Sequence, residues 1–161
     1  MTSKKKFKRH RQGQTNYKKR YLLLLSQIPR FCIRITNTKI IAQLIEYKDY
    51  KDKTICSFSS DMLSKYKWIG AHKNIPCAYL TGFVCAKLCL EKNIKKAVVD
   101  IGLKKAQKGG RLFGCVKGAI DAGLDLNAKK EMFPKEDILN GKFIKKEKLF
   151  LSVFENMKAS K

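Results

Sequence analysis

The sequence predicts an α/β domain in which a mixed β-sheet carries helices on one face. Three observations lead to this prediction. Residues 30–36 alternate between apolar and polar side chains, as a half-buried strand does. Residues 75–92 form a long helical stretch that is apolar on nearly every side, and residues 95–102 resemble a buried strand without alternation. An order of three strands, two helices, a strand and a helix is typical of a sheet covered by helices.

The first 14 residues are basic and polar and show no apolar period, so they are expected to form an extended arm. Thr15 or Asn16 is a candidate cap for a short helix over Tyr17–Leu25. Pro29 should end that helix before the first strand, because a proline disfavours helical geometry in the residue before it.

The three strands are expected to form an antiparallel meander. In Arg30–Thr36 the odd-numbered residues are apolar and lie on one face, while the even-numbered ones lie on the other. A turn leads to a return strand at Lys39–Tyr47, and a charged turn at 48–53 leads to a third strand at 54–59. Such a meander has one buried face and one that can meet a partner, and Arg34 and Gln43 fit the second face.

The helices are predicted from their caps and from their apolar patterns. Asp61 is expected to cap a short helix over Met62–Lys67, and Asn74 with Pro76 should open the long helix that ends near Lys92.

A loop containing lysine and glycine at 103–110 leads to a helix at Arg111–Ala122. Small residues recur at every fourth position from Gly110, and we expect them to serve close packing. After Leu126 the pattern weakens, and only a short amphipathic helix at Lys146–Met157 is predicted. The expected organisation is an arm at 1–14, an α/β domain at 15–128 and a tail at 129–161.

The charge of the chain narrows the class of partner. There are 36 Lys and Arg residues against 13 Asp and Glu, a formal net charge of +23, and residues 1–20 contain no acid. A polyanion such as nucleic acid would screen this self-repulsion. The apolar run at 21–25 is far shorter than the roughly 20 residues that span a membrane. We therefore expect a soluble, cytoplasmic protein with no membrane partner and no small-molecule substrate.

The six cysteines show no Cys-x-x-Cys pair, so their spacing does not predict a zinc ribbon. Cys85 and Cys89 would lie on one face of a helix, but a metal ion needs further ligands, and the only histidines are His10 and His72. We expect buried free thiols in a reducing compartment, with neither metal nor cofactor.

Basic residues accompany hydrogen-bonding and aromatic side chains in three places. In the arm, basic side chains alternate with Tyr17, whose ring can stack on an unpaired RNA base. The lysines of the 103–110 loop and Arg111 surround two glycines at a helix start, which either holds a phosphate or is an ordinary charged loop. A loop with Trp68, His72 and Lys73 could grip RNA, although Trp68 is equally suited to the edge of the core.

The residues of the chain do not suggest a catalytic site. The order of elements resembles a ribonuclease-H-like topology, whose nucleases place carboxylates on the first strand to hold two metal ions. Here the first strand contains no acid, and only Asp100, Asp121 and Asp125 occur in the C-terminal half of the core. We therefore expect no enzyme; a metal-dependent nuclease is the weakest alternative.

Several segments together resemble one family, the archaeal form of large-subunit ribosomal protein eighteen. They occur in order over about residues 8–126 and are GQTNYKKR (13–20), PR (29–30), NTKIIAQ (37–43), WIG (68–70), NIPCAYLTG (74–82), AVVDIGL (97–103) and KGAIDAGL (117–124). The sequence departs from the family after this point, where Asp125-Leu126-Asn127 replaces an Ile-Pro-His-like segment, and the tail matches only loosely.

The resemblance implies a non-enzymatic protein that binds 5S rRNA and anchors it in the central protuberance of the large subunit. Large-subunit rRNA, ribosomal protein five and other proteins of the central protuberance are the implied neighbours, and a ribonuclease-H-like motif is the implied fold. The alternative is an RNA chaperone or assembly factor that acts outside the mature ribosome. The residues expected to contact RNA are Arg9, Arg11, Asn16, Tyr17, Lys19, Arg20, Arg30, Arg34, Asn37, Lys39, Gln43, Trp68, His72, Lys73, Lys104, Lys108 and Arg111.

Overall fold

A mixed sheet organises the chain, as the sequence predicts, but it has five strands rather than the four expected, because the two-residue β5 was not predicted. The computed structural model describes residues 6–159, and the strands lie in the order β3-β2-β1-β4-β5. The first three strands pair antiparallel, whereas β4 pairs parallel with β1 and with β5. The strand bounds are Arg30–Ile35 (β1), Ile40–Lys48 (β2), Lys51–Ser59 (β3), Lys96–Asp100 (β4) and Asp125–Leu126 (β5). The order agrees with the expected α/β class, and the ribonuclease-H-like topology stays a prediction.

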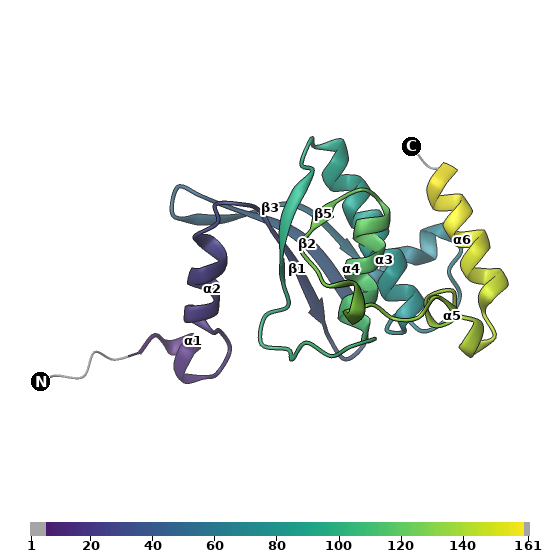
Figure 1. The fold of residues 1–161 in the computed structure, drawn as a ribbon, viewed down its shortest axis with the longest axis horizontal. Helices are drawn as coiled ribbons and strands as arrows, with labels where there is room; N and C mark the ends of the chain where they lie inside the picture. The colour runs from purple at the N-terminus through teal and green to yellow at the C-terminus, as the bar shows by residue number, and fades with distance from the viewer. Residues whose placement is uncertain (1–5, 160–161) are drawn as a thin grey trace, which may run out of the picture.

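Two helices, α3 (Ile75–Glu91) and α4 (Arg111–Asp121), cover one face of the sheet (Figure 1). The predicted cap of α3 is confirmed, because the Asn74 side chain accepts a hydrogen bond from the Cys77 backbone N–H at 2.8 Å. The two helices approach closely where glycines meet the opposite backbone. A Cβ atom on Gly118 would collide with the carbonyl oxygen of Tyr79, so the small-residue stripe serves packing as expected.

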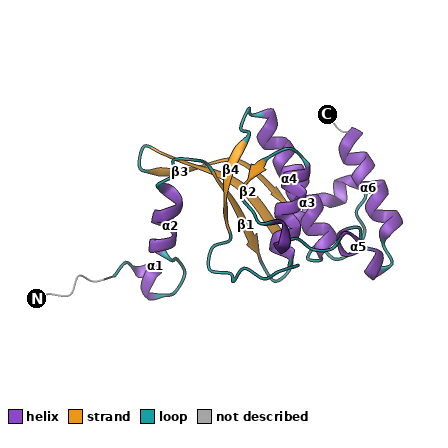
Figure 2. Ribbon diagram, in the orientation of Figure 1, coloured by secondary structure: helices purple, strands orange, loops and turns teal. Residues whose placement is uncertain are grey.

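The β2–β3 hairpin is longer and its turn tighter than predicted (Figure 2). Lys48 pairs with Lys51, and only Asp49 and Tyr50 form the turn, both with positive φ angles (52° and 61°). The prediction of a charged turn over 48–53 is therefore wrong. Charged side chains remain solvated on an exposed strand end, and a two-residue turn of this geometry matches the strand twist.

The segment after β3 also differs from its prediction. Residues Ser60–Tyr66 form a 3₁₀-helix, with Ser59 at the cap position. Asp61 lies inside this helix and forms an ion pair with Lys39 at 2.8 Å. Its prediction as a helix cap is therefore wrong, because a charge partner across the sheet edge engages the carboxylate.

The N-terminal arm is partly helical within the described residues. Lys8–Arg11 form a single helical turn, α1, where an extended chain was expected. The ring of Phe7 packs on that of Tyr17, with centroids 5.3 Å apart, and this contact folds the arm back on the next helix. That helix, α2 (Tyr17–Leu24), begins as predicted, since the Asn16 side chain accepts a hydrogen bond from the Lys19 backbone N–H.

The C-terminal residues continue the same hydrophobic core. After three short helical segments, Lys130–Met132, α5 (Glu136–Leu139) and Lys142–Ile144, the predicted amphipathic helix is confirmed as α6 (Glu147–Ala159). Helix α6 lies beside α3 (Figure 1) and buries Phe150, Val153 and Met157 in the core. Within residues 6–159, no helix is long and apolar enough to cross a membrane.

Candidate nucleic-acid interface

The sheet face turned away from α3 and α4 carries polar side chains, as predicted. Residues that pair directly on neighbouring strands share a face, and Cys32 pairs with Gln43 on β2 and with Asp100 on β4. Arg30 and Arg34, two residues to either side of Cys32, therefore lie on this face too. Arg34 and Gln43 occupy the face that the alternation of the sequence assigned to them.

Asp100, at the end of β4, is the centre of charge on this face. Its Oδ2 atom lies 3.1 Å from the Arg30 guanidinium and 3.1 Å from that of Arg34, and its Oδ1 atom accepts a hydrogen bond from the Gly102 backbone N–H at 2.8 Å. Burial alone would raise the pKa of this carboxyl, but the Gly102 hydrogen bond, the Arg34 guanidinium and the Cys32 thiol hold it below its usual value. Burial and the nearby carboxylate raise the pKa of Cys32 to about 12, so its thiol stays protonated and donates to Asp100.

Arg30 is buried rather than presented on an open surface. It is 3% exposed, and its second terminal nitrogen forms an ion pair with Asp52 of β3 at 2.9 Å. Among the described residues, its Nε atom has no hydrogen-bond partner. Arg30 lies on the predicted side of the sheet, but its side chain is buried and not exposed to solvent. Its guanidinium links two carboxylates and is not free to meet a phosphate.

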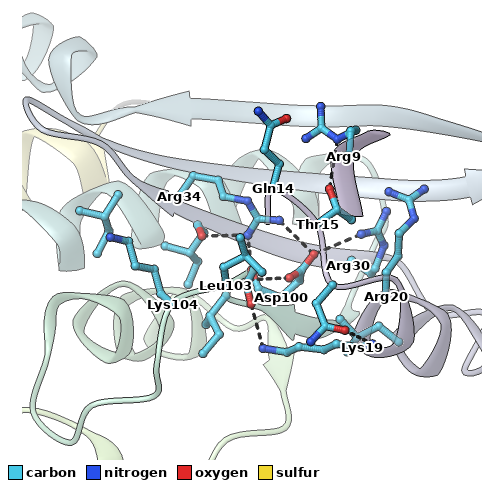
Figure 3. A pocket seen from close by; sticks show the side chains of 16 residues that line it. Arg9, Gln14, Thr15, Lys19, Arg20, Arg30, Arg34, Asp100, Leu103 and Lys104 are labelled. Carbon is cyan, nitrogen blue, oxygen red and sulfur yellow. Dashed lines mark hydrogen bonds and ion pairs between the residues drawn. The ribbon is translucent and has the colours of Figure 1, made fainter. Parts of the chain in front are cut away.

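The N-terminal segment is connected to this face by two contacts. Arg20 of α2 forms an ion pair with Asp52 at 2.8 Å, and Lys19 donates to the Gly102 carbonyl at 3.1 Å. Arg9 in α1 donates to Thr15 at 3.1 Å and so points toward the same region (Figure 3). The arm, the first strand and the loop after β4 thus converge, although they lie far apart in the sequence.

These elements enclose an open cavity of about 550 Å³ (Figure 3). Six basic side chains line it, against the single carboxylate of Asp100: Arg9, Lys19, Arg20, Arg30, Arg34 and Lys104. Gln14, Thr15 and Asn16 add neutral hydrogen-bonding groups. A cavity with this excess of guanidinium and ammonium groups suits a phosphate-bearing ligand, because arginine binds phosphate oxygens in pairs.

A second basic region adjoins the first through Lys104. This lysine and Ile35 also line a neighbouring cavity of about 500 Å³, together with Lys105 and Arg111 at the start of α4. Arg111 donates to the Lys73 carbonyl at 3.4 Å, and Lys73 donates to the Asn37 carbonyl at 3.1 Å.

Lys108 lies beyond the second cavity, where it and Arg111 line a third cavity of about 540 Å³. Residues predicted to contact RNA in three separate segments, Asn37, Lys73 and Arg111, are therefore neighbours in space. Arg111 in turn lies beside the 103–110 loop, which supplies Lys104 and Lys108.

The remaining predicted residues are spread over the protein or engaged within it. Lys39 pairs with Asp61, and Gln43 donates to Ser57 at 3.3 Å. His72 hydrogen-bonds the Ser60 carbonyl through Nδ1 at 2.9 Å. Trp68 is 3% exposed and donates to the Ala71 carbonyl, so of its two interpretations the structure supports the core edge and not RNA contact. Arg11 is exposed in α1.

The sequence reasoning missed the part that Asp100 plays. It considered this residue only as a nuclease carboxylate, whereas the structure places it among arginines. Gln14, Thr15 and Lys105 line the basic cavities but were not among the residues expected to contact RNA. The signal for Asp100 was present, since it is the only acid between residues 92 and 120 and lies near the end of the strand predicted at 95–102.

Comparison with known proteins assigns the family. The model of the family described as "Ribosomal large subunit proteins 60S L5, and 50S L18" matches residues 2–97 and 91–129. The chain is 44% identical over 142 residues to the large ribosomal subunit protein uL18 of Caldivirga maquilingensis, covering 88% of this chain and 69% of that protein. The corresponding proteins of Korarchaeum cryptofilum and Methanothermobacter thermautotrophicus are 42% and 39% identical, over 88% and 86% of this chain and 72% of each relative. These relatives are structural proteins of the ribosome and not enzymes. The chain belongs to this family of large ribosomal subunit proteins.

Proposed function

We propose that this protein binds 5S rRNA and anchors it in the central protuberance of the large ribosomal subunit, in the cytoplasm, beside large-subunit rRNA and ribosomal protein five. The observation that carries the proposal is the cavity in which six basic side chains surround one carboxylate. Its position supports the proposal as well, because the cavity joins the N-terminal arm to the sheet face, the two regions in which the resemblance to the family places RNA contacts.

The basic residues of the interface divide into two groups. Arg20 and Arg34 are held by carboxylates, and Lys19 by a carbonyl, so their positions are set before RNA arrives. Arg9, Arg11, Lys104 and Lys108 are exposed on the arm and the loop. We expect the exposed residues to contribute most of the phosphate contacts, and the fixed ones to set the register of the RNA.

A salt-titrated binding curve with 5S rRNA from the same organism, in the presence of excess transfer RNA, tests this proposal. Exchanging Arg9, Arg11 and Arg20 together for glutamine should weaken binding and lower the slope of log K against log salt, by roughly 0.7–0.9 for each phosphate that is no longer neutralised. The matched control exchanges Lys95, Lys96 and Lys148, which are exposed outside the cavity linings. Both variants lose three positive charges, so only a local role separates them.

Equal weakening by the two variants would mean that net charge alone drives binding. Binding that transfer RNA abolishes would contradict recognition of 5S rRNA. Co-sedimentation with mature large subunits distinguishes a ribosomal component from an assembly factor that acts outside the ribosome.

A further inference from the structure

Three cysteine sulfurs from two elements meet in the core beneath β3. Cys85 and Cys89 lie one turn apart on α3, and Cys56 faces them from β3. All three are buried, and their Sγ atoms lie within 4.8 Å of one another. Within residues 6–159 this is the only group of three or more cysteine, histidine or acidic side chains close enough to share a metal ion. Cys56 thus supplies a third sulfur beside the helical pair.

The high cysteine content of the chain does not by itself explain why these three sulfurs lie together, because the other three cysteines lie elsewhere in the core. The other three cysteines are also buried but lie apart from the cluster: Cys32 donates to Asp100, while Cys77 and Cys115 lie at the contact of α3 with α4. Within the cluster the sulfurs of Cys56 and Cys89 are 2.8 Å apart, and the Cys85 thiol donates to the Ala42 carbonyl at 3.4 Å.

The geometry suits a thiophilic cation. Three atoms no more than 4.8 Å apart leave a point within about 2.8 Å of all of them, and zinc–thiolate bonds measure about 2.3 Å. The Cys56 and Cys89 sulfurs would have to separate by roughly 1 Å to take tetrahedral positions around such an ion. A side-chain rotation moves a sulfur by that much without changing the backbone.

Charge favours a divalent ion over a monovalent one. Three thiolates with a divalent cation carry one net negative charge, whereas a monovalent cation would leave two in a buried site. The Lys92 ammonium donates to the carbonyl of Ile55, the residue before Cys56, and so places one compensating positive charge beside the cluster. Cys56 is also the most accessible of the three, at 7% exposed, which leaves its side for entry of the ion and for a fourth ligand such as water.

We propose that Cys56, Cys85 and Cys89 bind one thiophilic divalent cation of the Zn²⁺ class. Binding replaces three S–H protons by three metal–sulfur bonds and releases the three protons to solvent, with no change of oxidation state. The bound ion ties the middle of β3 to the last turns of α3. Because the unfolded chain does not hold these three sulfurs together, the ion should also stabilise the fold.

The test uses the reduced, metal-free full chain without RNA, so its outcome is independent of the proposed function. Under argon the chain is titrated with Cd²⁺, whose thiolate charge-transfer absorption reports sulfur ligation, and then with Zn²⁺. We expect one ion per chain by native mass spectrometry, absorption from three thiolates, release of three protons and a rise in the melting temperature. Cys89→Ala should weaken binding by at least tenfold, whereas the matched variant Cys77→Ala, buried on the same helix, should leave it unchanged.

Circular dichroism of both variants shows whether they fold, and the wild-type stoichiometry and proton count need no variant. The proposal is overturned if the reduced wild-type chain takes up no ion, if the absorption corresponds to fewer than three thiolates, or if Cys77→Ala weakens binding as much as Cys89→Ala. A Cys56–Cys89 disulfide in the untreated protein, combined with no metal uptake after reduction, would likewise overturn it and assign the close sulfurs to redox chemistry.

Discussion

Replacing Asp100 with asparagine removes one buried negative charge while keeping the size of the side chain. Within residues 6–159, Arg30, 3% exposed, then retains only Asp52 as an ionic partner, and Arg34 is left without a carboxylate partner. Removing one member of a buried ion pair costs about 3–5 kcal/mol, because the other charge stays buried. The asparagine oxygen can still accept from the Gly102 N–H, and Arg34 is partly solvated, so we expect a loss near the lower limit, about 3 kcal/mol.

Urea denaturation at pH 7, followed by far-UV circular dichroism, measures this loss. For a chain of this size about 3 kcal/mol corresponds to a fall in melting temperature of roughly 6–12 °C. The pH dependence gives a second readout. The pKa of Asp100 is lowered in the folded state, so its contribution is complete above the unfolded value of about 3.9 and is lost as the pH falls through the folded value. The stability difference between wild type and Asp100→Asn should therefore shrink in acid.

Asp61→Asn is the matched control. It removes the same charge from an ion pair of similar length, 2.8 Å to Lys39, but both side chains are well exposed. Solvent screening should limit its cost to less than about 1 kcal/mol. If Asp100→Asn costs no more than Asp61→Asn, or if its cost is independent of pH, the reasoning about the buried network is wrong.

Two further changes test the packing beneath the interface. Gly118→Ala should destabilise the fold by about 1–3 kcal/mol or more in the same urea experiment, because the added methyl group meets the Tyr79 backbone, whereas Gly114→Ala meets a movable Ile75 side chain at 3.2 Å and should be nearly neutral. Trp68→Ala should cost about 3–5 kcal/mol of stability but leave the affinity of the folded protein for RNA unchanged, and weaker binding by the folded variant would show that Trp68 stacks on RNA despite its burial.

The parts of the fold that the sequence predicted depend on local patterns. Alternation in residues 30–36 identified β1 and the two faces of its residues, and Asn74 with Pro76 located the start of α3. Both signals act between residues that are neighbours along the chain. The C-terminal region defeated the same approach. Its helical segments before α6 contain only three or four residues, and β5 contains two, too few to show a period.

The candidate site was predictable in its residue types but not in its arrangement. Alternation placed Arg30 on the polar face, yet its burial depends on Asp52 and Asp100, which are 22 and 70 residues away. Lys19 meets the Gly102 carbonyl across 83 residues. No local signal encodes such distances. The convergence of arm, strand and loop becomes visible only once the parallel pairing of β4 with β1 is known.

The ion pairs in the cavity limit how much the positive charge of its arginines can contribute to phosphate binding. Arg20 and Arg34 already have carboxylate partners, so an approaching phosphate must either compete with Asp52 and Asp100 or bind the outer edge of each guanidinium. Each such phosphate contact contributes less binding free energy than one made by a basic side chain without a carboxylate partner. The paired side chain, however, loses little conformational entropy on binding, because its position is already fixed. Phosphate contacts made by the exposed residues contribute more free energy, but each of these side chains loses more conformational entropy on binding. These residues are Arg9, Arg11, Lys104 and Lys108. We therefore expect the exposed residues to determine the salt dependence of binding, and the paired arginines to determine which RNA shape fits the cavity.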